Sequence, residues 1–154
     1  MKLTNDYIDF IQLLNENEVP YMVVGGYAVM AHGNPRFTMD FDIWIKPSVE
    51  IGKKMMTVLK DFGFVLKGLS EKDFEKDEMV VQLGYEPGRI DILCSISGVS
   101  FDEAYPHKVL KKLNNNDIWF IGLKDLIKNK EATGRDQDIV DAKKLRKIFL
   151  KQGK

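Results

Sequence analysis

Two aspartates interrupt an otherwise apolar run at residues 40–45, which read DFDIWI. Side chains of a strand alternate between its faces, so Asp40 and Asp42 point one way while Phe41 and Ile43 point towards a core. Two carboxylates held side by side repel each other unless a cation lies between them. The segment therefore predicts a half-buried strand whose polar face either holds a cation or lies in water at the end of the strand.

A third acid, Asp91, lies in the apolar segment 89–96, which reads RIDILCSI. Burial of an unpaired carboxylate is costly, so this residue also needs a partner. Arg89 shares its face of the strand and is one candidate, while a metal ion or a substrate hydroxyl are the others. Three strand-borne acids could hold two metal ions, which would activate an attacking oxygen and stabilise a leaving phosphate.

A Gly25-Gly26 doublet separates the apolar run at 21–24 from a short helical pattern. Such a turn exposes backbone N–H groups at the positive end of a helix, where a phosphate can bind. Glycine also lets a phosphate approach the backbone closely. Because turns need glycine for many reasons, the doublet gains its meaning from the acids that follow it.

The hydrophobic pattern predicts an α/β (α+β) fold with a mixed β-sheet of about four to five strands and helices packed on it. Strands are expected at residues 21–25, 40–46, 78–85, 89–96 and 117–122. Helices are expected at residues 5–16, 27–33, 48–63, 100–113 (with a possible break at Pro106), 123–132 and 136–152. We expect one domain over 1–154, with a catalytic core at 1–122 and a C-terminal helical extension at 123–154.

The composition narrows the functional classes. The 154 residues carry no formal net charge, which argues against a strongly basic nucleic-acid binder. The single cysteine, Cys94, can form no internal disulfide and belongs to no zinc-ligand spacing. Neither a signal peptide nor a membrane span is apparent. We therefore expect a cytoplasmic protein without a membrane partner.

Taken together, the Gly25-Gly26 turn, the Asp40-Phe41-Asp42 pair and the later Asp91 resemble the signature of the DNA polymerase beta-like nucleotidyltransferase superfamily. The run from Arg36 to Asp42 resembles the small bacterial members of that superfamily, which include aminoglycoside nucleotidyltransferases. A second block resembles the abortive-infection toxin types, and its matching positions are Lys130, Ala132, Arg135, Asp138 and Asp141.

The resemblance implies a transfer of a nucleoside monophosphate from a nucleoside triphosphate to an acceptor hydroxyl, with release of pyrophosphate. It implies magnesium as the cofactor, in a two-metal site, with manganese as an alternative. Implied catalytic and metal-binding residues are Asp40, Asp42 and Asp91, with Asp91 either binding metal or taking the acceptor's proton. Implied nucleotide-binding and phosphate-binding residues are Gly25, Gly26, Arg36, Thr38, Lys130 and Arg135.

Each basic or hydroxyl residue also has a purely structural interpretation. Thr38 fits an ordinary strand position, and Arg36 could pair with a surface acid. Lys130 and Arg135 could belong to a solvated helix face, the usual place of such residues in a charge-rich stretch. Asp138 could orient either of them.

The function itself has two rivals. One is a catalytically silent binding or regulatory module of the same fold, such as a toxin–antitoxin partner. The other is a non-enzymatic domain with exposed acids. The acceptor (a small molecule, a protein or tRNA), the preferred base and the oligomeric state stay open.

Overall fold

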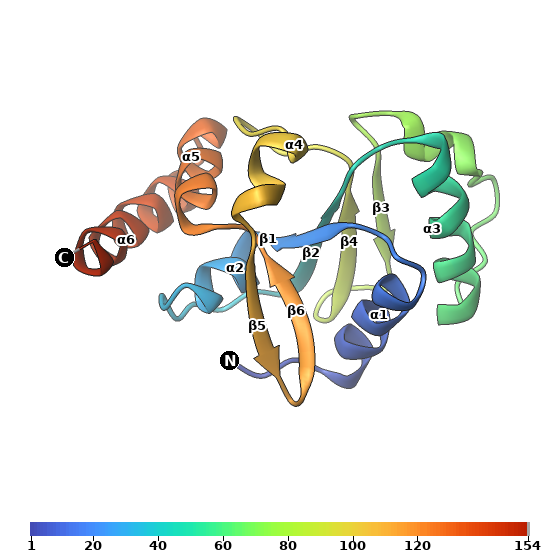
Figure 1. Cartoon of the computed structure of the whole chain (residues 1–154), viewed down its shortest axis with the longest axis horizontal. Coiled ribbons are helices and arrows are strands. Elements are labelled where there is room, and N and C mark those ends of the chain that lie inside the picture. Colours follow the sequence, from blue (N-terminus) through green and yellow to red (C-terminus); the bar gives the residue numbers. More distant parts are fainter. Residues whose placement is uncertain (154) are drawn as a thin grey trace.

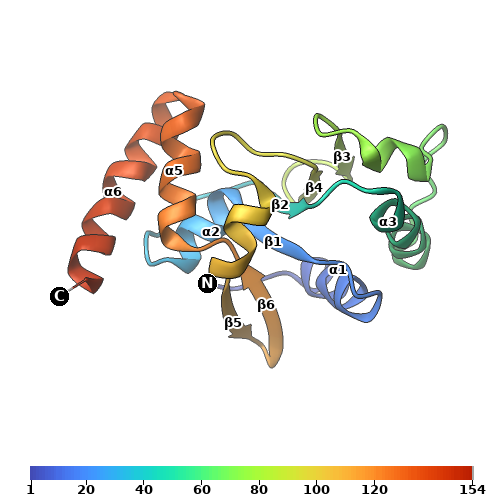
Figure 2. The same ribbon diagram turned by 45° about the horizontal axis from the view of Figure 1, so that its top comes forward.

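The structure, a computed structural model, describes residues 1–153 and contains a six-stranded mixed sheet (Figures 1 and 2). The strands are β1 (Tyr21–Val24), β2 (Asp40–Ile45), β3 (Val80–Leu83), β4 (Arg89–Leu93), β5 (Val109–Leu113) and β6 (Asn116–Phe120). Their order across the sheet is β3-β4-β2-β1-β6-β5. β2 runs parallel to β4, and β1 runs parallel to β6, while the other neighbours are antiparallel. The predicted mixed sheet is confirmed.

Helices surround this sheet. They are α1 (Asn5–Glu16), α2 (Gly25–Ala31), α3 (Val49–Phe62), α4 (Phe101–Ala104), α5 (Leu123–Thr133) and α6 (Asp136–Gln152). Two 3-10 helices cover Glu71–Glu75 and Tyr105–His107. None of the described helices combines the length and the apolar character that a membrane span needs.

One face of the sheet is covered by α1 and α3. The apolar stripe of α1 is buried there, and the ring of Tyr7 stacks on Phe41 of β2 with 4.5 Å between ring centroids. Phe10 makes an edge contact with Phe62 at the end of α3. Because Phe41 and Ile43 enter this core, the alternate residues of β2 must face the other side of the sheet.

The helix expected over residues 100–113 is wrong in its second half. α4 ends at Ala104, the 3-10 turn contains Pro106, and residues 109–113 form β5. Proline supplies no backbone N–H and restricts the residue before it, so the helix cannot continue through this position. Asn114 and Asn115 then adopt positive φ angles of 50° and 64°, which suits the tight turn of a β5–β6 hairpin. The sheet therefore has six strands.

Candidate active site

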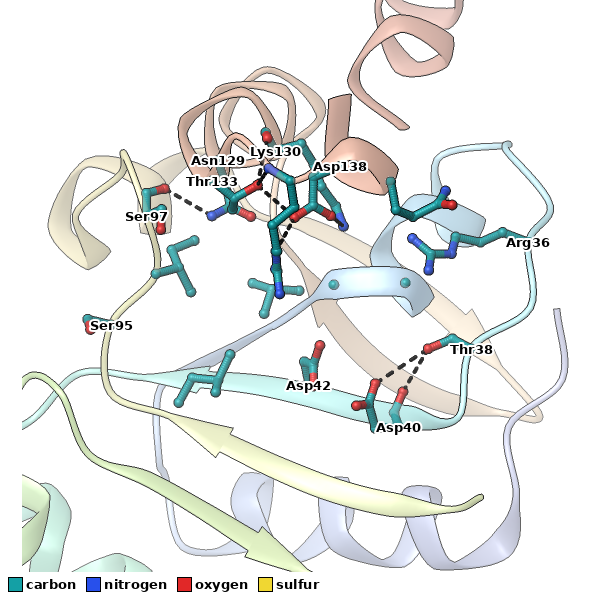
Figure 3. A pocket seen from close by; sticks show the side chains of 17 residues that line it. Arg36, Thr38, Asp40, Asp42, Ser95, Ser97, Asn129, Lys130, Thr133 and Asp138 are labelled. Carbon is teal, nitrogen blue, oxygen red and sulfur yellow. Dashed lines mark hydrogen bonds and ion pairs between the residues drawn. The ribbon is translucent and has the colours of Figure 1, made fainter. Parts of the chain in front are cut away.

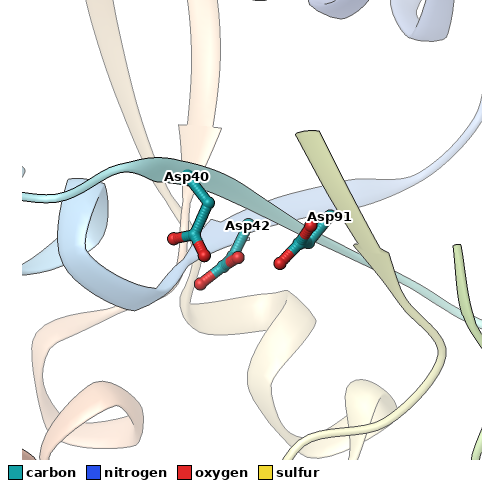
Figure 4. Close-up of side chains that lie close together, drawn as sticks. All are labelled: Asp40, Asp42 and Asp91. Carbon is teal, nitrogen blue, oxygen red and sulfur yellow. The ribbon is translucent and has the colours of Figure 1, made fainter. Parts of the chain in front are cut away.

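The three acids of the sequence pattern meet on the open face of the sheet. In the parallel pair β2–β4, Asp42 is directly opposite Asp91, and Asp40 is opposite Arg89. One carboxylate oxygen from each of Asp40, Asp42 and Asp91 lies within 4.8 Å of the others (Figure 4). The side-chain alternation that the sequence predicts thus gathers three negative charges in one place.

Arg89 lies among these acids and pairs with two of them. Its Nε donates to Asp91 Oδ1 at 2.7 Å, and one terminal nitrogen donates to Asp91 Oδ2 at 3.0 Å. The same terminal nitrogen donates to Asp40 Oδ2 at 3.1 Å. The pairing of Arg89 with Asp91, one of the options left by the sequence, is therefore present, and it coexists with the carboxylate cluster.

Asp42 has no such partner. Within residues 1–153 its carboxylate accepts no hydrogen bond, whereas Asp40 and Asp91 both do. Burial, followed by repulsion from Asp40 and Asp91, raises the pKa of Asp42 to about 7, although Lys130 and Arg89 act in the opposite direction. Burial and the charge of Asp91 also raise the pKa of Asp40. An unpaired carboxylate beside a second one is the oxygen-rich donor set that a magnesium ion takes, so these residues fit the ion.

The glycine doublet brings the backbone of α2 close to these acids. Gly25 has a φ of +69°, and a Cβ placed on it would lie 2.2 Å from Asp42 Oδ2. A Cβ on Gly26 would lie 2.8 Å from the Cβ of Thr38. The hydroxyl of Thr38 in turn donates to the backbone oxygen of Asp40 at 3.2 Å. Side chains at either glycine would push apart the residues that carry the acids.

On the helical side, Lys130 lies at the centre of a buried ion cluster. This lysine of α5 is 5% exposed, and its Nζ lies 2.8 Å from Asp138 and 3.3 Å from Asp141, both on α6. Arg36 forms a further ion pair with Asp141, and Arg135 Nε lies 2.8 Å from Asp138. The solvated helix face considered for Lys130 is therefore wrong, because two aspartates enclose it.

A cleft of about 450 Å³ separates the acids of the sheet from α5 and the start of α6 (Figure 3). This volume falls within the range of small-molecule sites. Of the nine residues that the resemblance implies as catalytic, metal-binding or phosphate-binding, eight line it: Gly25, Gly26, Arg36, Thr38, Asp40, Asp42, Lys130 and Arg135. Asp91 is the exception, because it is only 6% exposed and lies on the far side of the cluster, against Arg89.

Comparison with solved structures identifies this architecture. The lincosamide antibiotic adenylyltransferase LnuA, solved with lincomycin bound, matches with a TM-score of 0.58 and 18% identity over 96% of this chain and 99% of its own. TM1012 from Thermotoga maritima, a candidate nucleotidyltransferase, matches with a TM-score of 0.55 and 15% identity over 97% of each chain. The chain has the nucleotidyltransferase fold. No protein-family model matches the sequence, and no curated protein matches it.

Several residues that line the cleft of this nucleotidyltransferase fold carry no motif in the sequence. They are Ser95, Ile96 and Ser97 after β4, and Asn129, Thr133 and Gln137 on the helical side. Asn129 donates to the backbone oxygen of Ser97 at 2.9 Å, which joins α5 to the segment after β4. All six lie within seven residues of Asp91 or Lys130 in the sequence, and no other signal marks them.

Proposed function

We propose that this protein is a magnesium-dependent nucleotidyltransferase that moves a nucleoside monophosphate from a nucleoside triphosphate to an acceptor hydroxyl. The observation that carries the proposal is Asp42, whose carboxylate faces the cleft beside Asp40 and Gly25 and accepts no hydrogen bond from residues 1–153. A fold that stabilised itself alone would pair this charge or replace it. The nucleotidyltransferase fold supports the same conclusion.

In the proposed reaction, the acceptor oxygen attacks the α-phosphorus, and the bond from that phosphorus to the β-phosphate oxygen breaks. Pyrophosphate leaves, and the proton of the acceptor hydroxyl passes to a carboxylate of the cluster or to water. Asp40 and Asp42 would hold the divalent ion, and Asp91 completes the acid cluster. When bound, such an ion neutralises phosphate charge and polarises the reacting oxygens. The chain contributes mainly the positions and charges of its own groups.

The triphosphate lies, in this proposal, over the Gly25-Gly26 turn, where the cleft reaches the backbone. Lys130 and Arg135 line the opposite side, and they differ in availability. The charge of Lys130 is balanced by two buried aspartates, whereas the side chain of Arg135 is 77% exposed. Arg135 is therefore the cation that can swing towards a phosphate, and Lys130 mainly fixes the shape of the cleft.

The test is a transfer assay with α-labelled nucleoside triphosphates, magnesium and a cell extract as the source of acceptors. ATP comes first, because one structure of the same fold is an adenylyltransferase. We expect labelled product with the wild-type chain and none with the double variant Asp40→Asn/Asp42→Asn. Asp102→Asn, which alters an exposed acid paired with Lys46, is the matched control and keeps activity. Transfer that survives in the double variant would refute the proposal.

A further inference from the structure

We propose that Arg89 is a built-in cation of the acid cluster, and that it limits the nucleotide-free protein to one divalent ion, held by Asp40 and Asp42. This inference rests on the proposed function, because it concerns the same cluster. It adds a role for a residue that the superfamily resemblance does not assign. It also separates the three acids into two that face the cleft and one that is already neutralised.

Asp91 is the neutralised acid. Both of its oxygens accept from Arg89, at 2.7 Å and 3.0 Å, in the two-pronged arrangement that a guanidinium makes with a carboxylate. Asp91 is 6% exposed and does not line the cleft. Each oxygen of Asp91 keeps a second lone pair, but a divalent ion that approached it would meet the positive charge of Arg89 at close range.

Arg89 also reaches the neighbouring acids. The terminal nitrogen that binds Asp91 contacts Asp40 Oδ2 at 3.1 Å, and the other terminal nitrogen lies 3.2 Å from Glu86 in the β3–β4 loop. Cross-strand register fixes this arrangement, since Arg89 is directly opposite Asp40 on β2. A lysine could pair with both carboxylates but could not make the two-pronged contact with Asp91, so it would be a partial substitute.

The charge balance follows from these contacts. When ionised, Asp40, Asp42 and Asp91 carry three negative charges, and Arg89 compensates one of them at every physiological pH. Glu86 also lies beside Arg89, but its side chain is 41% exposed, so water screens its charge. Two negative charges then remain, which one divalent ion neutralises. Lys130 does not change this balance, because Asp138 and Asp141 already enclose it. A second divalent ion would be repelled by the charge of Arg89 unless further negative charge arrives with a nucleotide.

The experiment counts manganese ions bound to the full chain without nucleotide, by electron paramagnetic resonance of the free ion. We expect one ion per chain for the wild type and two for Arg89→Gln, which removes the internal cation. Arg89→Lys restores the charge and returns the count to one. Arg146→Gln, which breaks an exposed pair with Glu131, is the control and leaves one ion. Two ions on the wild type would overturn the inference.

A second pair of variants decides the matter if Arg89→Gln does not fold, as judged by circular dichroism. Asp91→Asn should keep the single manganese ion, whereas Asp42→Asn should weaken its affinity more than about 100-fold. An equal loss of manganese affinity in both variants would overturn the inference. It would leave the proposed function intact, provided that nucleotide transfer still depends on Asp42. Absence of manganese binding on the wild type would overturn the inference, and the transfer assay would then judge the function separately.

Discussion

The two sides of the cleft use buried charge in opposite ways. On the side of the sheet, burial and neighbouring acids raise the pKa of Asp42 to about 7, and no hydrogen bond reaches its carboxylate within the described chain. On the side of the helices, burial alone would raise the pKa of Asp138, but hydrogen bonds from Lys130 and Thr133 lower it instead. We call these the acidic wall (Asp40 and Asp42) and the paired wall (Arg36, Lys130, Asp138 and Asp141).

The comparison separates charges that serve the fold from charges that serve a ligand. Each carboxylate of the paired wall is satisfied by the chain itself, so removing a partner should damage stability. Asp42 costs stability as long as nothing positive binds it. Functional sites commonly keep such unfavourable arrangements. Variants on the two walls should therefore differ in whether they reduce activity or stability.

The largest effect is expected for Asp42→Asn on nucleotide transfer. Loss of the carboxylate that is proposed to hold the ion should lower the transfer rate by at least about 10³-fold, since charge stabilisation of this kind supplies several kcal/mol. Stability at pH 8 should stay equal or rise, because an unfavourable buried charge disappears. Transfer assays and thermal unfolding of the same preparation measure both. A clear drop in melting temperature would show that Asp42 belongs to the fold instead.

Lys130→Met, in contrast to Asp42→Asn, should lower the stability of the folded protein. It keeps the length of the side chain but leaves Asp138 and Asp141 without their shared cation, and Asp141 is only 1% exposed. Loss of one partner from a buried ion cluster costs about 3–5 kcal/mol, to be measured by urea unfolding. Lys143→Met, on the exposed side of α6, is the control and should be nearly neutral. A loss below about 1 kcal/mol would mean that Arg36 and Arg135 suffice to neutralise the aspartates.

The two walls also differed in how far sequence could predict them. The sequence could predict the acid cluster of Asp40, Asp42 and Asp91, because strand alternation places these residues on one face of their strands. The parallel pairing of β2 with β4 then brings Asp91 beside the other two acids. The paired wall joins Arg36 to Asp141, which are far apart in the chain, and no local pattern encodes that contact. Whether Asp91 pairs with Arg89 or with a metal was left open, because it depends on side-chain conformation.

Strand β5 could not be predicted from the sequence for a reason that lies in its own residues. The segment 107–113, HKVLKKL, contains good helix formers, and its apolar residues do not alternate cleanly. Antiparallel pairing with β6 through the Asn114-Asn115 turn decides its conformation. Tertiary context thus overrides a weak propensity, at a position well away from the acids.

A pH titration of stability tests the unpaired carboxylate of Asp42 separately from nucleotide transfer. The folded-state pKa of Asp42 is about 7, above the value of 3.8 expected for the unfolded chain. Between these values the folded protein keeps a proton that the unfolded chain has lost, so stability falls as the pH rises from about 4 to 7. The difference in unfolding free energy between wild type and Asp42→Asn should change by up to about 4 kcal/mol over this range, because each pKa unit corresponds to about 1.4 kcal/mol.

Magnesium provides the control for that titration. An ion that binds the ionised carboxylates stabilises the folded state only above the pKa of Asp42, so added magnesium should raise the melting temperature at pH 8 and not at pH 5. The same magnesium concentration should leave the melting temperature of Asp42→Asn unchanged at both pH values. A pH dependence that persists unaltered in Asp42→Asn would assign it to another group.

The smallest effect on stability is expected for Arg135→Ala. Its guanidinium pairs with Asp138, as Lys130 does, but the side chain is 77% exposed and water screens the pair. Exposed pairs contribute about 0–1 kcal/mol, so the melting temperature should hardly move. If Arg135 meets the triphosphate as proposed, the KM for nucleotide should rise several-fold while the maximal rate changes less. A stability loss like that of Lys130→Met would instead make Arg135 an essential member of the paired wall, and the cleft would then lack a free cation on its helical side.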